Sequence, residues 1–194
     1  MKTCKEYRLY AEKILKNNYC TMILMSLLYG AILSACMGSI LLGILLDGAL
    51  MVGLCIANMK LVRGEKVKVK DLFEAFDSCD LTSTIGLSVK TAVFTLLWSL
   101  LFIIPGIVAA YSYSMAPYIL ADKPELTGGE AIAESKRVMK GRKMKLFLLD
   151  LSYTGWILLG ILTLGILLIW VIPRMDAARA AFYEDLRKDL PAEA

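Results

Sequence analysis

Three long stretches of this chain carry almost no charge, at residues 19–58, 81–121 and 146–173. An apolar stretch of about 18 or more residues is typical of a membrane-spanning helix. The chain of 194 residues is 58% hydrophobic, and its mean hydropathy of +0.62 is above the usual range of soluble domains. The sequence therefore predicts a single all-α membrane domain over residues 1–194.

The basic residues lie mostly outside these apolar stretches. Residues 1–16, 60–70 and 123–145 hold seventeen of the 22 lysines and arginines. Basic loops stay on the cytoplasmic side of a membrane, so we expect these three segments and the N-terminus to be cytoplasmic. The same distribution explains the net charge of +4 without nucleic acid, which we do not expect as a partner.

Each apolar stretch between two cytoplasmic segments must cross the membrane an even number of times. A helix of forty residues would be about 60 Å long, twice the hydrocarbon thickness, whereas a hairpin of two spans fits. The first hairpin has two candidate turns, Gly38-Ser39 and Asp47-Gly48. In the second, Pro105 and Gly106 predict a turn, with a kink in one long tilted helix as the alternative.

The third apolar stretch is shorter and fits either one long span or two short ones. Gly165 is a candidate turn, after which a sixth helix would continue through Pro173 to about residue 186. The sequence thus predicts a polytopic bundle of about six helices in three hairpins. Five spans with the C-terminus outside is the alternative.

The apolar stretches begin at similar intervals, which suggests weak repeats over residues 1–60, 61–121 and 122–186. Each unit would begin with an amphipathic cytoplasmic helix, at residues 5–15, 69–76 and 129–139. Helices with a basic and an apolar face are typical of a membrane surface, and their basic faces favour anionic lipid headgroups. Three similar hairpins without any repeat would give the same pattern.

A charged cluster follows Pro173, which has no N–H and interrupts the hydrogen bonds of a helix. Arg174, Asp176 and Arg179 fall within two turns, and Asp176 and Arg179 have the i, i+3 spacing of a pair on one face. If the sixth helix spans the membrane, this cluster is a candidate polar site for an anionic headgroup or a peptide carboxylate. If that helix lies on the surface, the three are ordinary solvated charges.

Two other charges fall inside predicted spans. Lys90 and Asp150 have opposite charge and similar expected depth, so they are a candidate intramembrane ion pair. The alternative for Lys90 is that its long side chain reaches the cytoplasmic surface. Pro117 is a further candidate kink, because it frees a backbone carbonyl one turn earlier.

The sequence offers no catalytic, cofactor-binding or metal-binding residues. It has no histidine, which removes the commonest general base and metal ligand. Its five cysteines lack C-x-x-C spacing, and no phosphate-binding or nicotinamide-binding motif is present. We therefore expect a protein that is not an enzyme and that has neither cofactor nor metal.

Several short motifs resemble those of a family of bacterial integral membrane proteins, domain of unknown function 975. They are LVRGE at 61–65, DLFEAF at 71–76, IPGI at 104–107, YSMAPY at 113–118, A-x-x-x-S-x-x-x-M-x-G at 131–141, LSYTGW at 151–156 and AFYEDL at 181–186. The resemblance implies a multi-pass protein of the bacterial cytoplasmic membrane. The family is also distantly similar to the membrane domain of some glycerophosphodiester phosphodiesterases, from which no catalytic residues carry over.

Three functions fit this sequence. The leading hypothesis is a non-enzymatic membrane protein that organises or assists a membrane complex, or the handling of an envelope peptide or lipid. The second is a small transporter or permease-like subunit, and the third is a module that binds anionic lipids. The expected partners are membrane lipids and a membrane protein, and the sequence predicts no oligomeric state.

Overall fold

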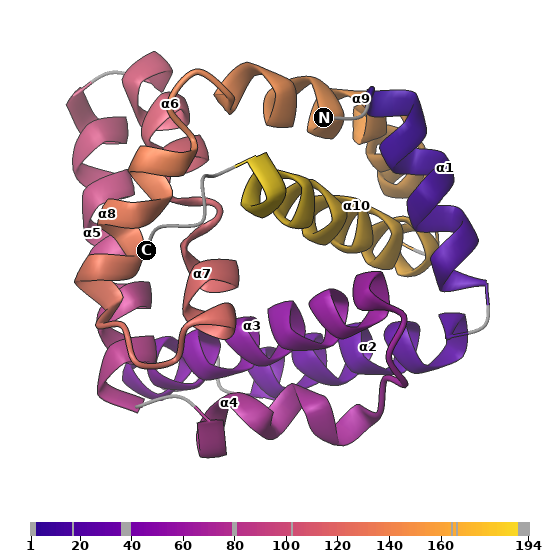
Figure 1. The fold of residues 1–194 in the computed structure, drawn as a ribbon, viewed down its shortest axis with the longest axis horizontal. Helices are drawn as coiled ribbons and strands as arrows, with labels where there is room; N and C mark the ends of the chain where they lie inside the picture. Colours follow the sequence, from indigo (N-terminus) through magenta and orange to yellow (C-terminus); the bar gives the residue numbers. More distant parts are fainter. Residues whose placement is uncertain are drawn as a thin grey trace.

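The computed structural model describes residues 3–16, 18–35, 40–78, 81–101, 103–163, 165 and 167–189. These residues form helices and turns, and no strand occurs among them, which confirms the predicted all-α class (Figure 1). The helices are α1 (Cys4–Leu15), α2 (Tyr19–Ala35), α3 (Ile40–Arg63), the 3-10 helix η2 (Val69–Phe73), α4 (Glu74–Ser78), α5 (Leu81–Leu101), α6 (Ile103–Tyr113), α7 (Ala116–Asp122), α8 (Gly128–Val138), α9 (Lys143–Leu162) and α10 (Leu168–Asp189).

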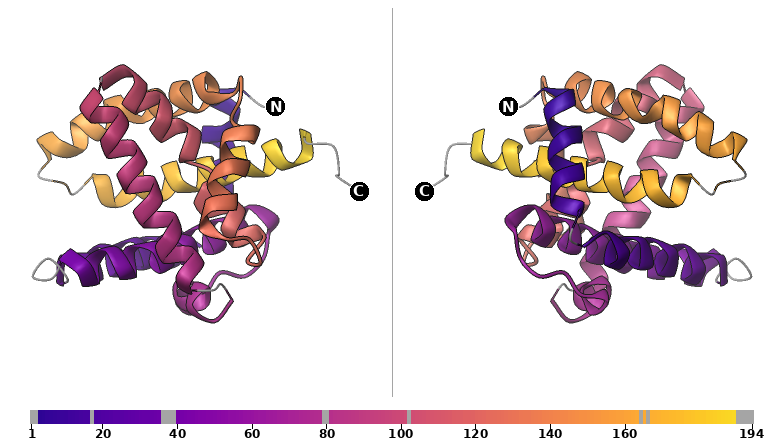
Figure 2. Two further views of the ribbon diagram at one scale, coloured as in Figure 1. Left: turned by 90° about the vertical axis from the view of Figure 1, so that its left-hand side faces the viewer. Right: turned by 90° about the vertical axis from the view of Figure 1, so that its right-hand side faces the viewer.

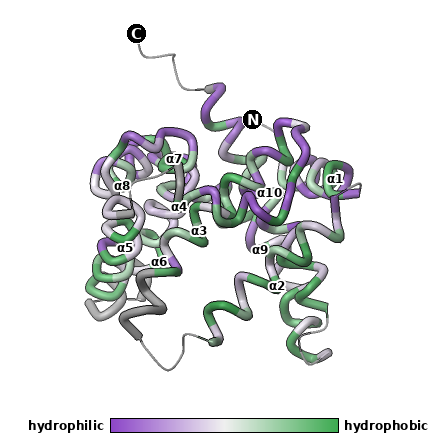
Figure 3. The backbone as a smooth tube through the Cα atoms, turned by 90° about the horizontal axis from the view of Figure 1, so that it is seen from below, coloured by the Kyte–Doolittle hydropathy of each residue, from purple (hydrophilic) through white to green (hydrophobic). Residues whose placement is uncertain are grey.

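The long helices pack in consecutive pairs, α2 with α3, α5 with α6, and α9 with α10. In each pair the second helix returns along the first, and the three pairs point their tips to one end of the molecule (Figure 2). The start of α1 and the end of α10 lie at the opposite end. Figure 3 shows the hydrophilic segments gathered there, around α1, α7, α8 and the end of α10, whereas the pairs are mainly apolar toward their tips.

Helix α10 lies at the centre of the molecule (Figure 1) and packs against α1, α2, α3 and α9. Its buried face includes small residues, and Ala177, Ala178 and Ala180 have no exposed surface. Small side chains let neighbouring helix backbones approach closely. Pro173 lies inside this helix as its sixth residue, and the helix continues through it to Asp189.

Other close contacts depend on glycine. A Cβ added to Gly53 of α3 would lie 1.9 Å from the carbonyl oxygen of Leu72 in η2. One added to Gly128, the first residue of α8, would lie 2.5 Å from the carbonyl oxygen of Ser83 in α5. Side chains at these two positions would collide with backbone, so the missing Cβ atoms allow η2 and α5 to pack where they do.

The candidate turns fall at different places in these pairs. The first pair reverses between Ala35 and Ile40. Gly38 and Ser39 lie outside the described residues, and the alternative turn is wrong because Asp47 and Gly48 lie within α3. The tyrosine hydroxyl of Tyr29 donates a hydrogen bond of 2.7 Å to Asp47 across the α2–α3 pair.

Apart from Pro173, the proline and glycine candidates of the later stretches lie at helix starts or between helices. Pro105 and Gly106 are in the first turn of α6 rather than between helices, where a proline without an N–H costs no hydrogen bond. Pro117 lies at the start of α7, so it begins a new short helix. Gly165 lies between α9 and α10 with a φ of +87°, a left-handed conformation that glycine adopts readily.

Helix α9 is the one described helix that, taken singly, is long and apolar enough to cross a membrane. Of its apolar window, 22% is buried inside the structure. Helices α1 and α2 satisfy the same criterion only when joined, and they meet at an angle of 99°. By length and composition, the described helices thus supply one candidate span, or two if the bent α1–α2 pair is counted as one span.

Candidate functional site

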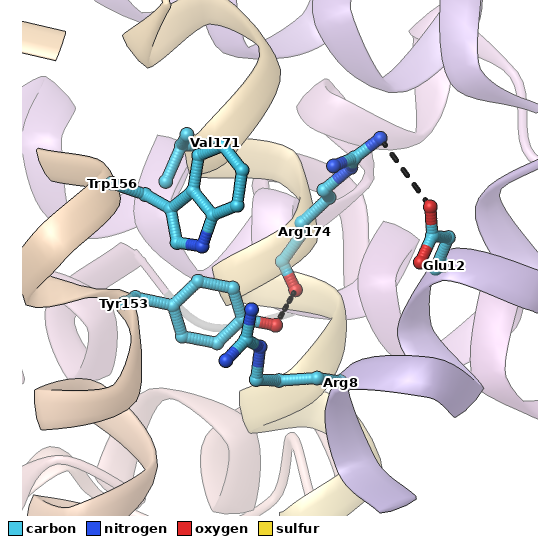
Figure 4. Close-up of a pocket in the computed structure, with 6 residues that line it drawn as sticks. All are labelled: Arg8, Glu12, Tyr153, Trp156, Val171 and Arg174. Carbon is cyan, nitrogen blue, oxygen red and sulfur yellow. Dashed lines mark hydrogen bonds and ion pairs between the residues drawn. The ribbon is translucent and has the colours of Figure 1, made fainter. Parts of the chain in front are cut away.

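An open pocket lies where α1 crosses the α9–α10 pair (Figure 4). Its volume is about 220 Å³. Helix α1 contributes Arg8 and Glu12, α9 contributes Tyr153 and Trp156, and α10 contributes Val171 and Arg174. We call it the two-arginine pocket, because its two cations come from opposite ends of the chain.

Arg174 is held over an aromatic ring. Its guanidinium carbon lies 5.6 Å from the centre of the Tyr19 ring, a cation–π geometry. That ring is itself fixed, since the hydroxyl of Tyr19 donates a hydrogen bond of 2.7 Å to the carbonyl oxygen of Trp170. The guanidinium therefore has a defined position at the pocket wall, although the side chain is 37% exposed.

The hydrogen-bonding capacity of Arg174 is not used up. Its Nε is buried and has no hydrogen-bond partner among the described residues. Its Nη2 lies 3.8 Å from a carboxylate oxygen of Glu12, whose side chain is 62% exposed. This distance is too long for a hydrogen bond, and an ion pair so exposed contributes little. The guanidinium of Arg174 can therefore bind another anion in place of Glu12.

Arg8 faces the same pocket from α1. Its guanidinium carbon lies 5.3 Å from the centre of the Tyr153 ring, and its Nη1 donates a weak hydrogen bond of 3.4 Å to the carbonyl oxygen of Ser152. The hydroxyl of Tyr153 donates a bond of 3.4 Å to the carbonyl oxygen of Arg174. Tyr153 thus links the two arginines, as Figure 4 shows.

The chemistry of this pocket is that of an anion site. Two guanidiniums and one carboxylate line it, and guanidinium groups present several N–H donors in the planar arrangement that carboxylate and phosphate oxygens accept. The exposed ring of Trp156 stands beside them. Indole rings are common where apolar and polar surroundings meet. The pocket can therefore hold a phosphate or carboxylate whose attached chain continues along an apolar surface.

The predicted cluster Arg174, Asp176 and Arg179 is not one site. The three residues follow one another on α10 but lie in different places: Arg174 lines the two-arginine pocket, Asp176 lines a cavity beside α2 and α3, and Arg179 pairs with Asp150 of α9. The predicted i, i+3 pair of Asp176 with Arg179 is therefore wrong. Arg179 pairs instead with Asp150 of the neighbouring helix, because both carboxylate oxygens of Asp150 accept hydrogen bonds from the guanidinium.

The predicted pair between Lys90 and Asp150 is also replaced. Arg179 donates from Nε and Nη2 to the two oxygens of Asp150 at 3.0 and 2.8 Å. Tyr111 adds a hydrogen bond of 3.2 Å from its hydroxyl. Lys90 is exposed on α5, and its ammonium lies against the backbone of Gly129 in α8. Similar expected depth was a poor guide here, because α5 packs against α3, α6 and α8, whereas α9, which holds Asp150, packs against α10.

Sequence reasoning missed Arg8, Glu12, Tyr153 and Trp156. Arg8 was recognised only as one of the basic residues of the N-terminal segment, and 144 residues separate it from its hydrogen-bond partner Ser152. No local spacing brings α1 to α9. One available signal was Tyr153 and Trp156 at i, i+3 in α9, which places two aromatic rings on one helix face.

No described residues form a group of three or more cysteine, aspartate or glutamate side chains that could hold a metal ion. The polar groups of the two-arginine pocket are mainly cationic and do not suit a cation.

Residues 100–189 match the family model described as "Protein of unknown function (DUF975)". The resemblance inferred from the sequence motifs is thereby confirmed over these residues, which include α9, α10 and four of the six pocket residues. No curated protein and no solved structure matches the chain. The distant likeness to the membrane domain of glycerophosphodiester phosphodiesterases stays a prediction.

Proposed function

We propose that this protein is a non-enzymatic integral membrane protein that binds anionic lipid headgroups in the two-arginine pocket and thereby organises or assists a membrane complex. The observation that carries the proposal is the arrangement of Arg8 and Arg174 around one open pocket, where Nη2 of Arg174 lies 3.8 Å from Glu12, too far for a hydrogen bond. Of the three candidate functions, this arrangement favours lipid binding, with the assisting role as its consequence.

The apolar surface of α9 supports membrane insertion. Its outer face exposes Leu151, Leu158 and Leu162, the last with 80% of its surface accessible. Soluble proteins rarely expose contiguous apolar patches of this kind. Tyr153 and Trp156, which line the pocket, belong to the same helix and lie between these leucines in sequence. An acyl chain on this surface would leave its headgroup within reach of the arginines.

The proposal places the protein in the bacterial cytoplasmic membrane, and the arrangement of the three helix pairs supports six spans with the N-terminus on the cytoplasmic side. Their tips share one end of the molecule, and the hydrophilic helices share the other (Figures 2 and 3). The basic segments 60–70 and 123–145 connect the pairs at that hydrophilic end, as the positive-inside rule requires. Anionic headgroups of the cytoplasmic leaflet would then face α1.

A transporter or permease-like subunit is the second candidate. It needs a polar cavity within the bundle, and the cavity that contains Asp176 is the observation in its favour. That cavity is lined by apolar side chains in large part, among them Met51, Leu54 and Ile172. The two-arginine pocket is the more polar of the two, so we place lipid binding first.

Binding is tested with protein purified in a neutral detergent and titrated with phosphatidylglycerol or phosphatidylcholine, with bound lipid counted by native mass spectrometry. We expect saturable binding of the anionic lipid alone. Arg8→Gln combined with Arg174→Gln should weaken it by on the order of tenfold or more, because two charge-assisted contacts are lost.

The matched control is Lys66→Gln combined with Lys140→Gln. It removes the same net charge from two exposed lysines that are absent from the pocket lining. The control should bind like the wild type. Equal weakening in both double variants would show that net charge alone attracts the lipid, and unchanged binding in the arginine variant would show that the pocket is not the site.

A further inference from the structure

A second cavity lies between α2, α3, α7 and α10, apart from the two-arginine pocket. Its volume is about 350 Å³, and its polar lining includes Asn58 of α3, Asp176 of α10 and the tyrosines Tyr29 and Tyr118. The remaining wall is mainly aliphatic. None of these residues takes part in the proposed lipid site.

Asn58 leaves an acceptor unused in this cavity. The residue is only 1% exposed. Its Nδ2 donates a hydrogen bond of 2.9 Å to the carbonyl oxygen of Leu54, which fixes the orientation of the amide, because a carbonyl oxygen cannot accept from Oδ1. Oδ1 is left buried with no hydrogen-bond partner among the described residues. A buried polar atom of this kind is costly unless a donor reaches it.

Asp176 adds a second acceptor on the same wall. No hydrogen bond or ion pair joins its carboxylate to another described residue. Arg179 acts on it electrostatically, but the Nε and Nη2 of that guanidinium donate to Asp150. The residues that line the cavity therefore include a carboxylate and a buried amide oxygen, and neither oxygen group has a donor among the described residues.

We infer that this cavity binds a small organic ammonium ion, whose N–H groups donate to Asp176 and to Oδ1 of Asn58. Primary ammonium groups carry three donors and one positive charge. The rings of Tyr29 and Tyr118 supply aromatic surface for the cation, and the apolar wall suits a short carbon chain. The hydroxyl of Tyr29 is turned to Asp47 at 2.7 Å, so it does not compete for the acceptors.

The test is thermal unfolding of the protein in neutral detergent with methylammonium, ethylammonium or tetramethylammonium chloride. A ligand that binds the folded state raises its unfolding temperature in a saturable way. We expect such a rise with methylammonium and ethylammonium. Tetramethylammonium has the same charge but no N–H donor, so we expect no saturable rise with it. Equal stabilisation by all three ions would overturn the inference.

Asp176→Asn keeps the shape of the side chain and removes its charge. We expect this variant to unfold at the same or a higher temperature without ligand, since an unpaired carboxylate is removed, and to bind methylammonium on the order of tenfold more weakly. Asn58→Leu should weaken binding also, because it removes the second acceptor. The matched control is Glu125→Gln, which removes one exposed carboxylate and should bind like the wild type.

Two further outcomes decide the inference. If Asp176→Asn binds methylammonium as the wild type does, the cavity is not the site. If no ammonium ion gives a saturable rise in the wild type, the acceptors are satisfied by water or by a proton, and the inference is wrong. The variant Arg8→Gln with Arg174→Gln should retain ammonium binding, which separates this result from that of the lipid proposal.

Discussion

Asp150 of α9 and Arg179 of α10 form a two-point ion pair, with Nε and Nη2 of the arginine 3.0 and 2.8 Å from the two carboxylate oxygens. The pair joins two consecutive helices across 29 residues of sequence. Tyr111 of α6 adds a third contact to the same carboxylate. Asp150 therefore connects three helices.

Replacing Asp150 by Asn should lower the free energy of unfolding by about 2 kcal/mol, because the half-buried Arg179 loses its charged acceptor. Arg179→Gln should cost a similar amount. The exchange Asp150→Arg with Arg179→Asp should recover part of the loss in a double-mutant cycle measured by chemical denaturation in detergent. Lys90→Gln is the control, since Lys90 is exposed, and it should have little effect. A large effect of Lys90→Gln that disappears in the Asp150→Asn background would favour the original Lys90–Asp150 pair instead.

Glu12 competes with any anion for Arg174, since its carboxylate lies 3.8 Å from Nη2. Glu12→Gln should therefore strengthen binding of phosphatidylglycerol by about two- to fivefold, the range expected for an exposed ion pair. Native mass spectrometry at several lipid concentrations measures the change. Glu125→Gln, the same change at an exposed site away from the pocket, should leave the affinity as it is. Weaker binding in Glu12→Gln would mean that the carboxylate belongs to the site.

Gly53 permits close packing of α3 against η2. Gly53→Ala should lower the free energy of unfolding by about 3 kcal/mol or prevent folding, because its Cβ would lie 1.9 Å from the carbonyl oxygen of Leu72. Gly86→Ala in α5 is the control, since nothing lies within 4 Å of its added Cβ. That change should stabilise the helix by roughly 0.5–1 kcal/mol. Thermal unfolding of both variants in one detergent distinguishes them, and equal stability would disprove the tight contact.

The orientation of the protein can be measured by labelling single cysteines in intact cells. In a variant without native cysteines, Lys68→Cys and Lys140→Cys should be protected from a membrane-impermeant thiol reagent, because both lie in basic segments expected in the cytoplasm. Thr163→Cys, at the far end of α9, should react. Labelling of position 68 or 140 from outside would contradict the three-hairpin arrangement.

The cap of α8 should depend on pH. The backbone N–H and the hydroxyl of Thr127 each donate a hydrogen bond of 2.8 Å to Glu130, and they hold the pKa of that carboxyl below its ordinary value of 4.5. A lowered pKa means that the ionised carboxylate stabilises the folded state above the ordinary value, and that this contribution is lost as pH falls through the lowered pKa. Thr127→Ala should raise the pKa of Glu130, which NMR titration of the carboxyl carbon would measure. An unchanged pKa would show that the cap does not hold the charge.

Some of these features follow from local sequence. Periodicity and charge located the helices of the three apolar stretches, and Gly165 marked the connection between α9 and α10. The match over residues 100–189 agrees with the motifs of that region. Local information was enough because a helix forms its own backbone hydrogen bonds, and its ends depend on a few neighbouring residues.

The choice of partners came only from the tertiary structure. The sequence by itself determined that Asp150 needs a partner of opposite charge. Arg179 is that partner because α10 returns beside α9. Lys90 lies on α5, where its ammonium group is close to α8. The two-arginine pocket likewise exists because α1 crosses α9, 144 residues away in sequence. Charge and hydropathy state what a side chain requires of its surroundings. Which group satisfies that requirement depends on how helices that are distant in sequence pack together. Arg174, Asp176 and Arg179 all belong to α10, but each side chain has different neighbours.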